Sequence, residues 1–448
     1  MNTIKQFPYE QVLVLGLAKS GAAAARILLE NGKKVRVNDF KKEEENQAAQ
    51  ELRHFGIEVI TGGHPLSVLD DVEVVIKNPG IPYDNVIVKE AIHRNIPVIT
   101  EIELAGLLTD GPIVGITGSN GKTTTTTLIY EMLRSSGEKA KLSGNIGTVA
   151  SEVARDSDPD DILVMELSSF QLLGIQTFKA NISVLLNIFE AHLDYHKTMS
   201  HYANAKAKIF ENQTEDDYAV YNLDDERVVE LADRTNARKV PFSVTRPCKD
   251  GVWFDGDTVY FKDEPIIKRN EIVLVGDHNF ENILAAIAAS RLMGATPEAI
   301  RNVLTTFQGV RHRMQFVREF ENRTFYNDSK ATNILATSSA LNAFKQPIIL
   351  LAGGLDRGND FDELIPYLDN VKSMVLFGQT AEKIKNTANQ AGIHDVKIVD
   401  NVEQAVQHAY AQSESGDVVL LSPACASWDQ YRSFEERGDM FVRAVHKL

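Results

Sequence analysis

The sequence repeats one local pattern three times: a short β-branched apolar run, a glycine-bearing turn, and then a stretch with helical periodicity. These runs cover residues 12–15, 113–117 and 347–352. A parallel strand is buried on both faces, so it is continuously apolar, and a helix must carry the chain back to begin the next strand. The pattern therefore predicts an α/β protein built on parallel sheets.

Chain length and turn positions predict how many domains carry these sheets. The chain has 448 residues, and a single hydrophobic core rarely grows beyond roughly 250 to 300 residues. Turn-rich stretches precede the second and third runs, at residues 108–112 and 308–313. We therefore expect three domains, at residues 1–103, 104–309 and 310–448. Within the second, the alternating apolar pattern of residues 251–272 predicts a small antiparallel sheet.

Composition narrows the class of protein. The formal net charge of −15 argues against a general nucleic-acid binder, which needs clustered cations against phosphates. The two cysteines show no metal-ligand spacing and predict neither disulfides nor zinc. The N-terminus lacks the apolar segment of a signal peptide, and no run of about 18 apolar residues could span a bilayer. We expect a cytoplasmic protein.

The strongest local motif follows the second apolar run, where TGSNGKTT joins a strand to a helix. Glycines let backbone N–H groups turn toward phosphate oxygens, a lysine adds positive charge beside them, and a threonine hydroxyl can bind magnesium. A glycine-rich turn with an exposed lysine is the structural alternative. The residues that we expect to hold ATP here are Gly118, Ser119, Asn120, Gly121, Lys122, Thr123 and Thr124.

The first apolar run leads into a weaker motif, a degenerate dinucleotide fingerprint at residues 16–21. Asp39 follows the second strand at the position that usually contacts a ribose. Taken alone, this motif offers an NAD-dependent oxidoreductase as the alternative function. However, Ala18 replaces the middle glycine, and a complete ATP loop lies downstream.

The order of motifs along nearly the whole chain resembles the Mur ligases of bacterial peptidoglycan synthesis. After TGSNGKTT come GNIG (144–147), ELSSFQL (166–172), HNFEN (278–282), HRMQ (312–315), NDSKATN (327–333) and LSPACASWDQY (421–431). ELSSFQL and LSPACASWDQY resemble the branch that adds D-glutamate to UDP-N-acetylmuramoyl-L-alanine. The resemblance implies a Rossmann-like N-terminal domain, a central ATPase-like domain with a parallel sheet, and a Rossmann-like C-terminal domain.

The resemblance also implies a metal and catalytic group in the central domain. Glu166 ends a predicted strand, where magnesium collects in α/β sheets, although a solvated glutamate is the alternative. By resemblance His192 helps to hold a second magnesium, and Lys206 is carbamylated, with Lys208 as the competing alignment. Carbamylation needs a neutral amine and hence a lowered pKa. The expected catalytic set is Lys122, Glu166, His192 and Lys206, and the expected metal ligands are Thr123, Glu166, His192 and the Lys206 carbamate.

The resemblance distributes the substrates over the other motifs. Asn279 and Asn282 are expected to cap a helix and touch the adenine or ribose, and Arg313 and Asp328 to face the nucleotide. The expected contacts of the UDP substrate are Lys19, Ser20, Gly21, Asp39, Phe40, Asn78, Pro79, Gly80 and Asn145. The expected contacts of D-glutamate are Lys330, Thr332, Arg357, Ser427, Trp428 and Phe434. Some relatives carry lysine at the position of Arg357, and Trp428 replaces a commoner aliphatic residue, which leaves the details of those contacts open.

The activity implied is amide formation through an acyl phosphate, with release of ADP and phosphate. We expect a monomer whose C-terminal domain closes after nucleotide binds, so that water is excluded from the acyl phosphate. The alternatives are a Mur or folylpolyglutamate-type ligase with another substrate, a nucleotide-gated binding protein without ligation, and the oxidoreductase. Dependence of phosphate release on D-glutamate separates them.

Overall fold

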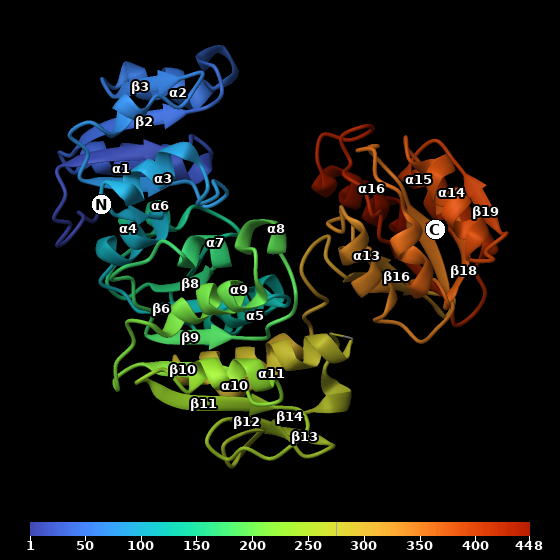
Figure 1. The fold of residues 1–448 in the computed structure, drawn as a ribbon. Helices are drawn as coiled ribbons and strands as arrows, with labels where there is room; N and C mark the ends of the chain where they lie inside the picture. Colours follow the sequence, from blue (N-terminus) through green and yellow to red (C-terminus); the bar gives the residue numbers. More distant parts are fainter. Residues whose placement is uncertain (275) are drawn as a thin grey trace. The chain divides into compact units, whose positions relative to one another are not determined.

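The computed structural model describes residues 1–274 and 276–448, which form two compact units (Figure 1). The first unit is Met1–Ile272 with His278–Thr305, and the second is Val273–Asp277 with Thr306–Leu448. The first unit contains a five-stranded and a nine-stranded sheet, and the second contains a six-stranded sheet. The predicted α/β class is confirmed, while the division into three domains stays a prediction.

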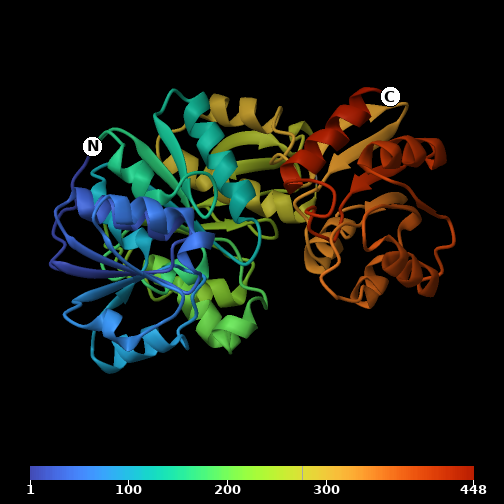
Figure 2. The same cartoon turned by 90° about the horizontal axis from the view of Figure 1, so that it is seen from above.

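The N-terminal sheet is parallel throughout, in the order β3-β2-β1-β4-β5. Its strands are β1 (Gln11–Leu15), β2 (Lys34–Asp39), β3 (Glu58–Thr61), β4 (Val74–Lys77) and β5 (Val98–Ile99). Helices α1 (Lys19–Glu30) and α2 (Gln47–His54) contribute to the core on one face, and α3 (Val86–His93) covers the other (Figure 2). The strand order reverses between β1 and β4, which is where ligands bind in open α/β sheets.

The central sheet is parallel from β7 to β12 and antiparallel beyond, in the order β14-β13-β12-β11-β10-β9-β6-β8-β7. Its strands are β6 (Ile113–Thr117), β7 (Ala140–Gly144), β8 (Ile162–Glu166), β9 (Ile182–Leu185), β10 (Tyr218–Asn222), β11 (Arg238–Ser243), β12 (Val252–Phe254), β13 (Thr258–Phe261) and β14 (Glu264–Lys268). The antiparallel hairpins predicted for residues 251–272 are therefore confirmed. They form the edge of the large sheet rather than a separate layer.

The helices of this region are mostly short. They are α4 (Glu101–Leu108), α5 (Lys122–Ser135), α6 (Ala150–Arg155), α7 (Ser169–Leu172), α8 (Leu193–His196), α9 (Met199–Ala207), α10 (Glu226–Ala232), α11 (Asp277–Leu292) and α12 (Pro297–Leu304). Because α11 begins at Asp277, Asn279 and Asn282 lie within it, and the prediction that they cap a helix is wrong.

The third sheet, in the second unit, has the order β15-β16-β20-β17-β18-β19, and only β15 runs antiparallel. Its strands are β15 (Gln315–Phe320), β16 (Arg323–Asn327), β17 (Ile348–Ala352), β18 (Val371–Leu376), β19 (Val396–Ile398) and β20 (Val418–Leu421). Helices α13 (Ile334–Leu341) and α14 (Ala381–Gln390) pack on one face, and α15 (Val402–Gln412) and α16 (Phe434–His446) pack on the other. This two-sided cover gives the Rossmann-like layering expected.

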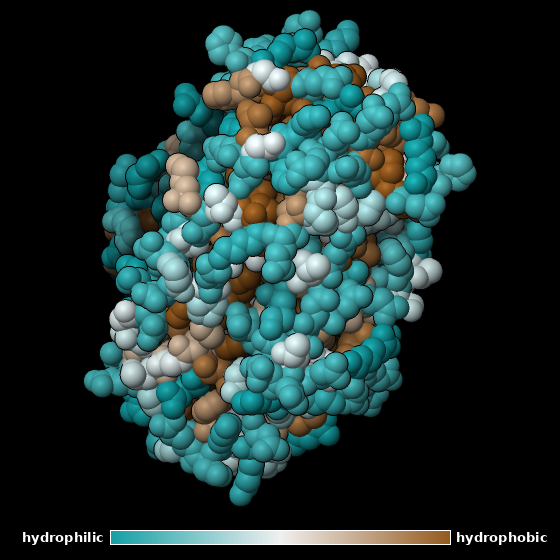
Figure 3. All heavy atoms as spheres, turned by 90° about the vertical axis from the view of Figure 1, so that its left-hand side faces the viewer, coloured by the Kyte–Doolittle hydropathy of each residue, from teal (hydrophilic) through white to brown (hydrophobic). Residues whose placement is uncertain are grey.

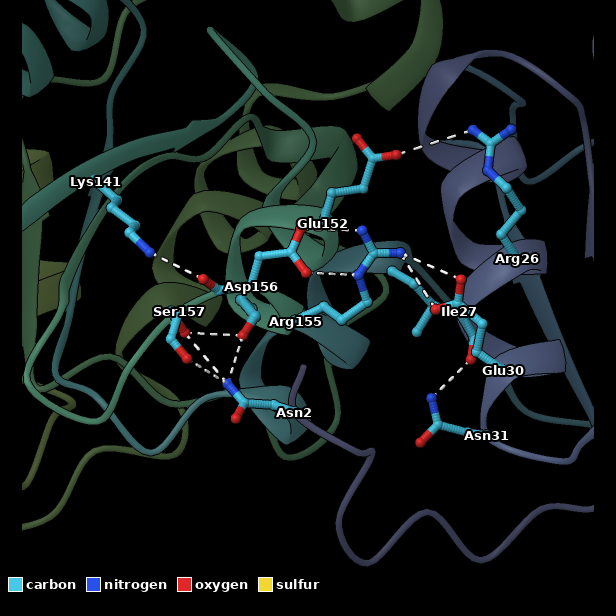
Figure 4. Close-up of polar contacts among 11 residues, drawn as sticks. Asn2, Arg26, Ile27, Glu30, Asn31, Lys141, Glu152, Arg155, Asp156 and Ser157 are labelled. Atoms are coloured by element: carbon cyan, nitrogen blue, oxygen red, sulfur yellow. Dashed lines mark hydrogen bonds and ion pairs between the residues drawn. The ribbon is translucent and has the colours of Figure 1, made fainter.

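Polar contacts join the two sheets of the first unit. Asn2 donates to the carbonyls of Ala154 and Ser157 at 2.9 and 2.8 Å, and Arg155 pairs with Glu30 at 3.2 Å (Figure 4). These contacts tie the N-terminal segment and the end of α1 to the end of α6 within the first unit.

The surface is mostly hydrophilic on the face drawn in Figure 3, with hydrophobic atoms scattered between polar ones. Scattered apolar atoms are normal on a protein surface and mark no site by themselves. In the part of the chain that the structure describes, no helix has the length and apolarity needed to cross a membrane.

Candidate active site

The phosphate loop joins β6 to α5, as the sequence predicts. Gly121 precedes the helix with φ +83°, a left-handed conformation that favours glycine. A Cβ atom there would lie 2.0 Å from Oδ1 of Asn282. The glycine therefore lets Asn282 of α11 approach the loop closely, which places one expected nucleotide contact against the phosphate loop.

Side chains from neighbouring segments hold this loop in shape. Nζ of Lys122 donates to the carbonyls of Gly118 and Ser119 at 2.8 and 3.0 Å. Asn187, beyond the end of β9, accepts from the backbone N–H groups of Ser119 and Asn120 at 3.0 and 2.9 Å. The amine thus lies at the glycine turn, beside the N-terminus of α5, where the helix dipole favours anions. The motif alone gives no sign of Asn187, because it lies about 70 residues away in the chain.

A pair of buried oxygen ligands lies next to the loop. Glu166, the last residue of β8, accepts from the Thr123 hydroxyl at 2.7 Å and from the Asn145 amide at 2.7 Å. β7 and β8 are adjacent strands, so Asn145, which follows β7, reaches the same sheet edge. A carboxylate and a hydroxyl are hard oxygen donors, which suit Mg²⁺. The donor set at Thr123 and Glu166 fits the metal that the motif predicts.

Lys206 reaches the same loop from α9. The residue is 2% exposed, and its amine donates to the Gly118 carbonyl at 2.8 Å and lies 4.7 Å from the Tyr202 ring centre. Burial, and then the nearby charge of Lys122, lower the pKa of Lys206 well below its usual value, while Glu166 acts in the opposite direction. Lys208, the competing alignment, forms an ion pair with Glu211 at 3.0 Å. The two lysines therefore differ in environment, and only Lys206 lies at the phosphate loop.

His192 lies in the segment that leads into α8. Its backbone is left-handed, with φ +56°, and its ring lies 5.1 Å from Phe170 and 6.3 Å from Tyr202. Among the side chains that the structure describes, no three of the types His, Cys, Asp or Glu form a metal-binding group. Metal ligation by His192 and by a Lys206 carbamate therefore stays a prediction.

At the end of the N-terminal sheet, the loops after β1, β2 and β4 meet. Asp39 accepts from the backbone N–H groups of Leu17 and Lys41 at 2.6 and 2.8 Å. The Asn78 amide donates to the Ser20 hydroxyl at 3.0 Å. Because these loops flank the reversal of strand order, they lie where open α/β sheets bind ligands in a crevice.

Close packing explains the glycines of this crevice. A Cβ on Gly21 would lie 1.9 Å from the Gly16 carbonyl, and one on Gly16, which has φ +90°, would lie 2.8 Å from Ile81. Phe40 is 70% exposed, 5.6 Å from the His64 ring, and Lys19 is exposed at the start of α1. Of the expected UDP contacts, Ser20 and Gly21 lie at the start of α1, Asp39 ends β2, and Asn78 and Gly80 lie in the turn after β4, whereas Asn145 lies against Glu166.

The second unit groups the remaining motifs at the ends of β16 and β20. Asp328 accepts from Met314 N–H at 3.1 Å and from the Ser422 hydroxyl at 2.9 Å. Burial raises the pKa of Asp328 to about 7, against the opposing effects of those hydrogen bonds and of Arg313. Lys330 lies with its amine 5.8 Å from the Phe434 ring. An acid and a base thus share one strand terminus, as NDSKATN predicts.

An arginine, a tryptophan and two hydroxyl-bearing residues complete the set predicted for D-glutamate. The Arg357 guanidinium lies 5.1 Å from the Trp428 ring, which is 65% exposed. The buried Ser427 hydroxyl has no hydrogen-bond partner within the described part of the chain. The contacts recorded for Thr332 involve only its backbone, which donates to Lys330 O at 2.9 Å. These side chains offer a cation, a hydroxyl and an aromatic face to a ligand of the second unit.

Sequence reasoning missed the buried arginine beneath these loops. Arg437 of α16 is fully buried and donates to Ser329, Gly353 and Cys425 at 2.8 to 3.4 Å. Burial lowers its pKa to about 10. It ties together loops that follow three adjacent strands, β16, β20 and β17. In the sequence, however, Arg437 stands in a charged helical stretch, where an arginine is normally exposed to solvent.

Comparison with known proteins identifies the family. The Mur ligase MurD-like N-terminal domain matches residues 10–100, the Mur ligase middle domain matches residues 116–290, and the Mur ligase glutamate ligase domain matches residues 312–425. The UDP-N-acetylmuramoylalanine–D-glutamate ligase of Geobacillus kaustophilus is 59% identical over 450 residues, covering 100% of both chains. The enzyme of that name from Bacillus subtilis is 58% identical over 98% of both chains.

Solved structures share the fold at low identity. UDP-N-acetylmuramate–alanine ligase from Thermotoga maritima superimposes with a TM-score of 0.56 at 18% identity, covering 98% of this chain and 99% of that one. MurF ligase from Thermotoga maritima, solved in complex with ADP, gives a TM-score of 0.56 at 18% identity, covering 97% of this chain and 95% of that one. These likenesses concern the fold alone.

Fold and site together define an α/β enzyme with a phosphate loop, a buried carboxylate beside that loop and Rossmann-like flanking sheets. The chain belongs to the Mur ligase family, whose members are ATP-dependent ligases that form amide bonds. The oxidoreductase alternative is thereby excluded.

Proposed function

We propose that this chain joins D-glutamate to UDP-N-acetylmuramoyl-L-alanine, with hydrolysis of ATP to ADP and phosphate, in peptidoglycan precursor synthesis. The observation that carries the proposal is the convergence of Lys122, Lys206 and the Thr123–Glu166 pair on one phosphate loop. The full-length identity of 58–59% to relatives with this printed name supports the choice of substrates.

A carboxylate is a poor electrophile, so the reaction needs activation. An oxygen of the L-alanyl carboxylate attacks the γ-phosphorus of ATP, ADP leaves, and an acyl phosphate results. The D-glutamate amine then attacks the acyl carbon, phosphate departs with the oxygen that the carboxylate supplied, and the amine loses a proton. Charge on the transferred phosphoryl oxygens is what the protein must stabilise.

The residues of the first unit have distinct parts in this proposal. Lys122 neutralises phosphate charge, and the loop formed by Gly118, Ser119, Asn120, Gly121 and Thr124 holds the phosphates, with Asn279 and Asn282 at the base and ribose. Magnesium, when bound by Thr123 and Glu166, supplies Lewis-acid charge stabilisation to the transferring phosphoryl group. His192 and a carbamate on Lys206 would extend this metal site. The low pKa of Lys206 supports the carbamate, because only a neutral amine adds carbon dioxide.

The substrates are assigned by the loops that hold the expected residues. The diphosphate and uridine take the crevice of Lys19, Ser20, Gly21, Asp39, Phe40, Asn78, Pro79 and Gly80, and Asn145 takes the sugar-peptide part. Both D-glutamate carboxylates need cations and hydroxyls, which Lys330, Thr332, Arg357 and Ser427 offer beside Trp428 and Phe434. Arg313 and Asp328 face the nucleotide. We further propose three domains, with boundaries near residues 103 and 309, and a monomer acting in the cytoplasm.

The test measures ADP release by purified protein given ATP, magnesium, UDP-N-acetylmuramoyl-L-alanine and an amino acid. We expect release with D-glutamate and none with L-glutamate, L-alanine or a diamino acid. Lys122→Ala should abolish it, whereas Lys139→Ala, at an exposed lysine just beyond α5, should retain it. Release with another amino acid in preference to D-glutamate would refute the substrate assignment, and full activity of Lys122→Ala would refute the role of the loop.

A further inference from the structure

A buried lysine lies under the crevice of the N-terminal sheet. Lys77, the last residue of β4, is 1% exposed, and its amine donates to the carbonyls of Pro79 and Ile81 at 3.2 and 3.0 Å. It also donates to the Tyr195 hydroxyl at 3.2 Å. None of the ion pairs among the described residues includes Lys77. An apolar side chain would fill this core position at less cost, because a buried ammonium must be compensated by hydrogen bonds.

Tyr195 brings a second segment to the same turn. It belongs to α8, 118 residues away in sequence, and its hydroxyl lies 3.1 Å from the Ile81 carbonyl and 3.4 Å from the Pro79 carbonyl. Its ring packs against Phe170 at 4.6 Å, and Phe170 packs against His192 at 5.1 Å. The turn after β4 is therefore linked to the segment that carries His192.

The hydrogen bonds from Lys77 fix how the turn presents its polar groups. In a trans peptide the C=O and the following N–H point in opposite directions, so holding the Pro79 carbonyl toward Lys77 directs the Gly80 N–H away from it. The Gly80 N–H donates to the side-chain Oδ1 of Asn78 at 3.1 Å. Nδ2 of the same Asn78 side chain donates to the Ser20 hydroxyl at 3.0 Å. One peptide plane thus connects Lys77 to the hydrogen bonds that join Gly80, Asn78 and Ser20.

We propose that Lys77 and Tyr195 are positioning residues that hold the turn of residues 78–81 in the shape needed to bind the diphosphate of the sugar nucleotide, and that they couple this turn to the His192 segment. The inference rests on the proposed function, since it takes the crevice as the sugar-nucleotide site. Neither side chain contacts the ligand in this account. Burial lowers the pKa of Lys77 to about 7, with Tyr83 and Tyr195 as the rings beside it and Asp84 near Tyr195. Its charge state there is therefore sensitive to its surroundings.

The test compares Lys77→Met, Tyr195→Phe and the double variant with the unchanged chain. Binding of UDP-N-acetylmuramoyl-L-alanine and of ATP is measured separately by titration calorimetry, and KM and kcat follow from ADP release. Because each single variant loses a buried hydrogen bond, we predict that each binds the sugar nucleotide at least about tenfold more weakly than the unchanged chain. ATP affinity should stay within about twofold, and the double variant should bind little worse than the weaker single one because both act on one turn.

Tyr83→Phe is the matched control. The Tyr83 ring lies 4.9 Å from the Lys77 amine, but the Tyr83 hydroxyl forms no hydrogen bond within the described residues. Removing this hydroxyl should therefore change neither the sugar-nucleotide affinity nor the ATP affinity. If Lys77→Met fails to fold, Tyr195→Phe, which removes a single oxygen, carries the test. Should the unchanged chain fail to bind the sugar nucleotide, the proposed function is refuted. Should it bind while the variants bind equally well, or lose ATP affinity to the same degree, the positioning role is refuted.

Discussion

At the scale of single residues, environment separates side chains that the sequence leaves equivalent. Lys206 and Lys208 lie two positions apart, yet one amine is buried against the Gly118 carbonyl and the other pairs with Glu211 on the surface. The motif order predicts a lysine here, but burial decides which amine can stay neutral. Conversely, Lys77 ends an apolar strand, and the sequence does not reveal its burial, because its amine contacts Tyr195 of α8, more than a hundred residues away.

Replacing Lys206 tests its place in the site. We expect Lys206→Ala to lower kcat about 100-fold or more, since one charge-stabilising group near a reacting phosphoryl is typically worth that much. Lys208→Ala is the matched control and should retain activity. Spectra of protein under ¹³C-labelled carbon dioxide should show a carbamate signal that is lost in Lys206→Ala and fades as the pH falls, because protonation competes with carbamylation. A signal unchanged in Lys206→Ala would contradict the assignment.

Asp328 should make the second unit less stable as the pH rises from about 4 to 7. Its folded pKa of about 7 lies above the usual 3.8, so the folded state binds more protons between these values, and the free energy of unfolding falls as the pH rises from 4 to 7. The slope is at most about 1.4 kcal/mol per pH unit. Denaturant unfolding at several pH values should show this slope in the unchanged chain and a smaller one in Asp328→Asn. Equal slopes would show that the buried carboxyl does not titrate there.

At the scale of elements, apolar runs predict strands well because a strand buried on both faces admits few polar residues. Residues 12–15, 113–117 and 347–352 became β1, β6 and β17 with shifts of one residue at most. The expected cap at Asn279 and Asn282 failed because α11 begins at Asp277, one turn earlier. Motif spacing could not reveal that Asn282 packs on Gly121 or that Asn187 holds the loop, since both depend on how distant elements meet.

The glycine that opens α5 provides a test at this scale. Gly121→Ala and Gly137→Ala both place an alanine at positive φ, +83° and +88°, which costs roughly 1 to 2 kcal/mol of unfolding free energy. Only at Gly121 would the new Cβ also meet Asn282; nothing lies within 4 Å at Gly137. We expect Gly121→Ala to be destabilised at least as much as Gly137→Ala, and only Gly121→Ala to lose ATP affinity, measured by calorimetry. Equal ATP affinity in the two would contradict the close packing of Asn282 on the loop.

At the scale of the whole molecule, three sheets offer three strand-end sites, and the expected substrates are divided among them. Sheet order and the family resemblance predict this division, but they carry no information on how the two compact units move. Because the acyl phosphate must be kept from water, we predict that nucleotide and sugar nucleotide together compact the chain. Small-angle scattering should show a smaller radius of gyration with both ligands than without. An unchanged radius would count against closure, with Lys122→Ala as the control that should not respond to ATP.

The central claim is that the phosphate loop transfers a phosphoryl group to the substrate carboxylate before the amine attacks. Its most direct test uses UDP-N-acetylmuramoyl-L-alanine with ¹⁸O in both carboxylate oxygens, and mass spectrometry of the products. The account predicts that each inorganic phosphate released carries one ¹⁸O and that the new amide keeps the other. Amide formed alongside phosphate without ¹⁸O would contradict it.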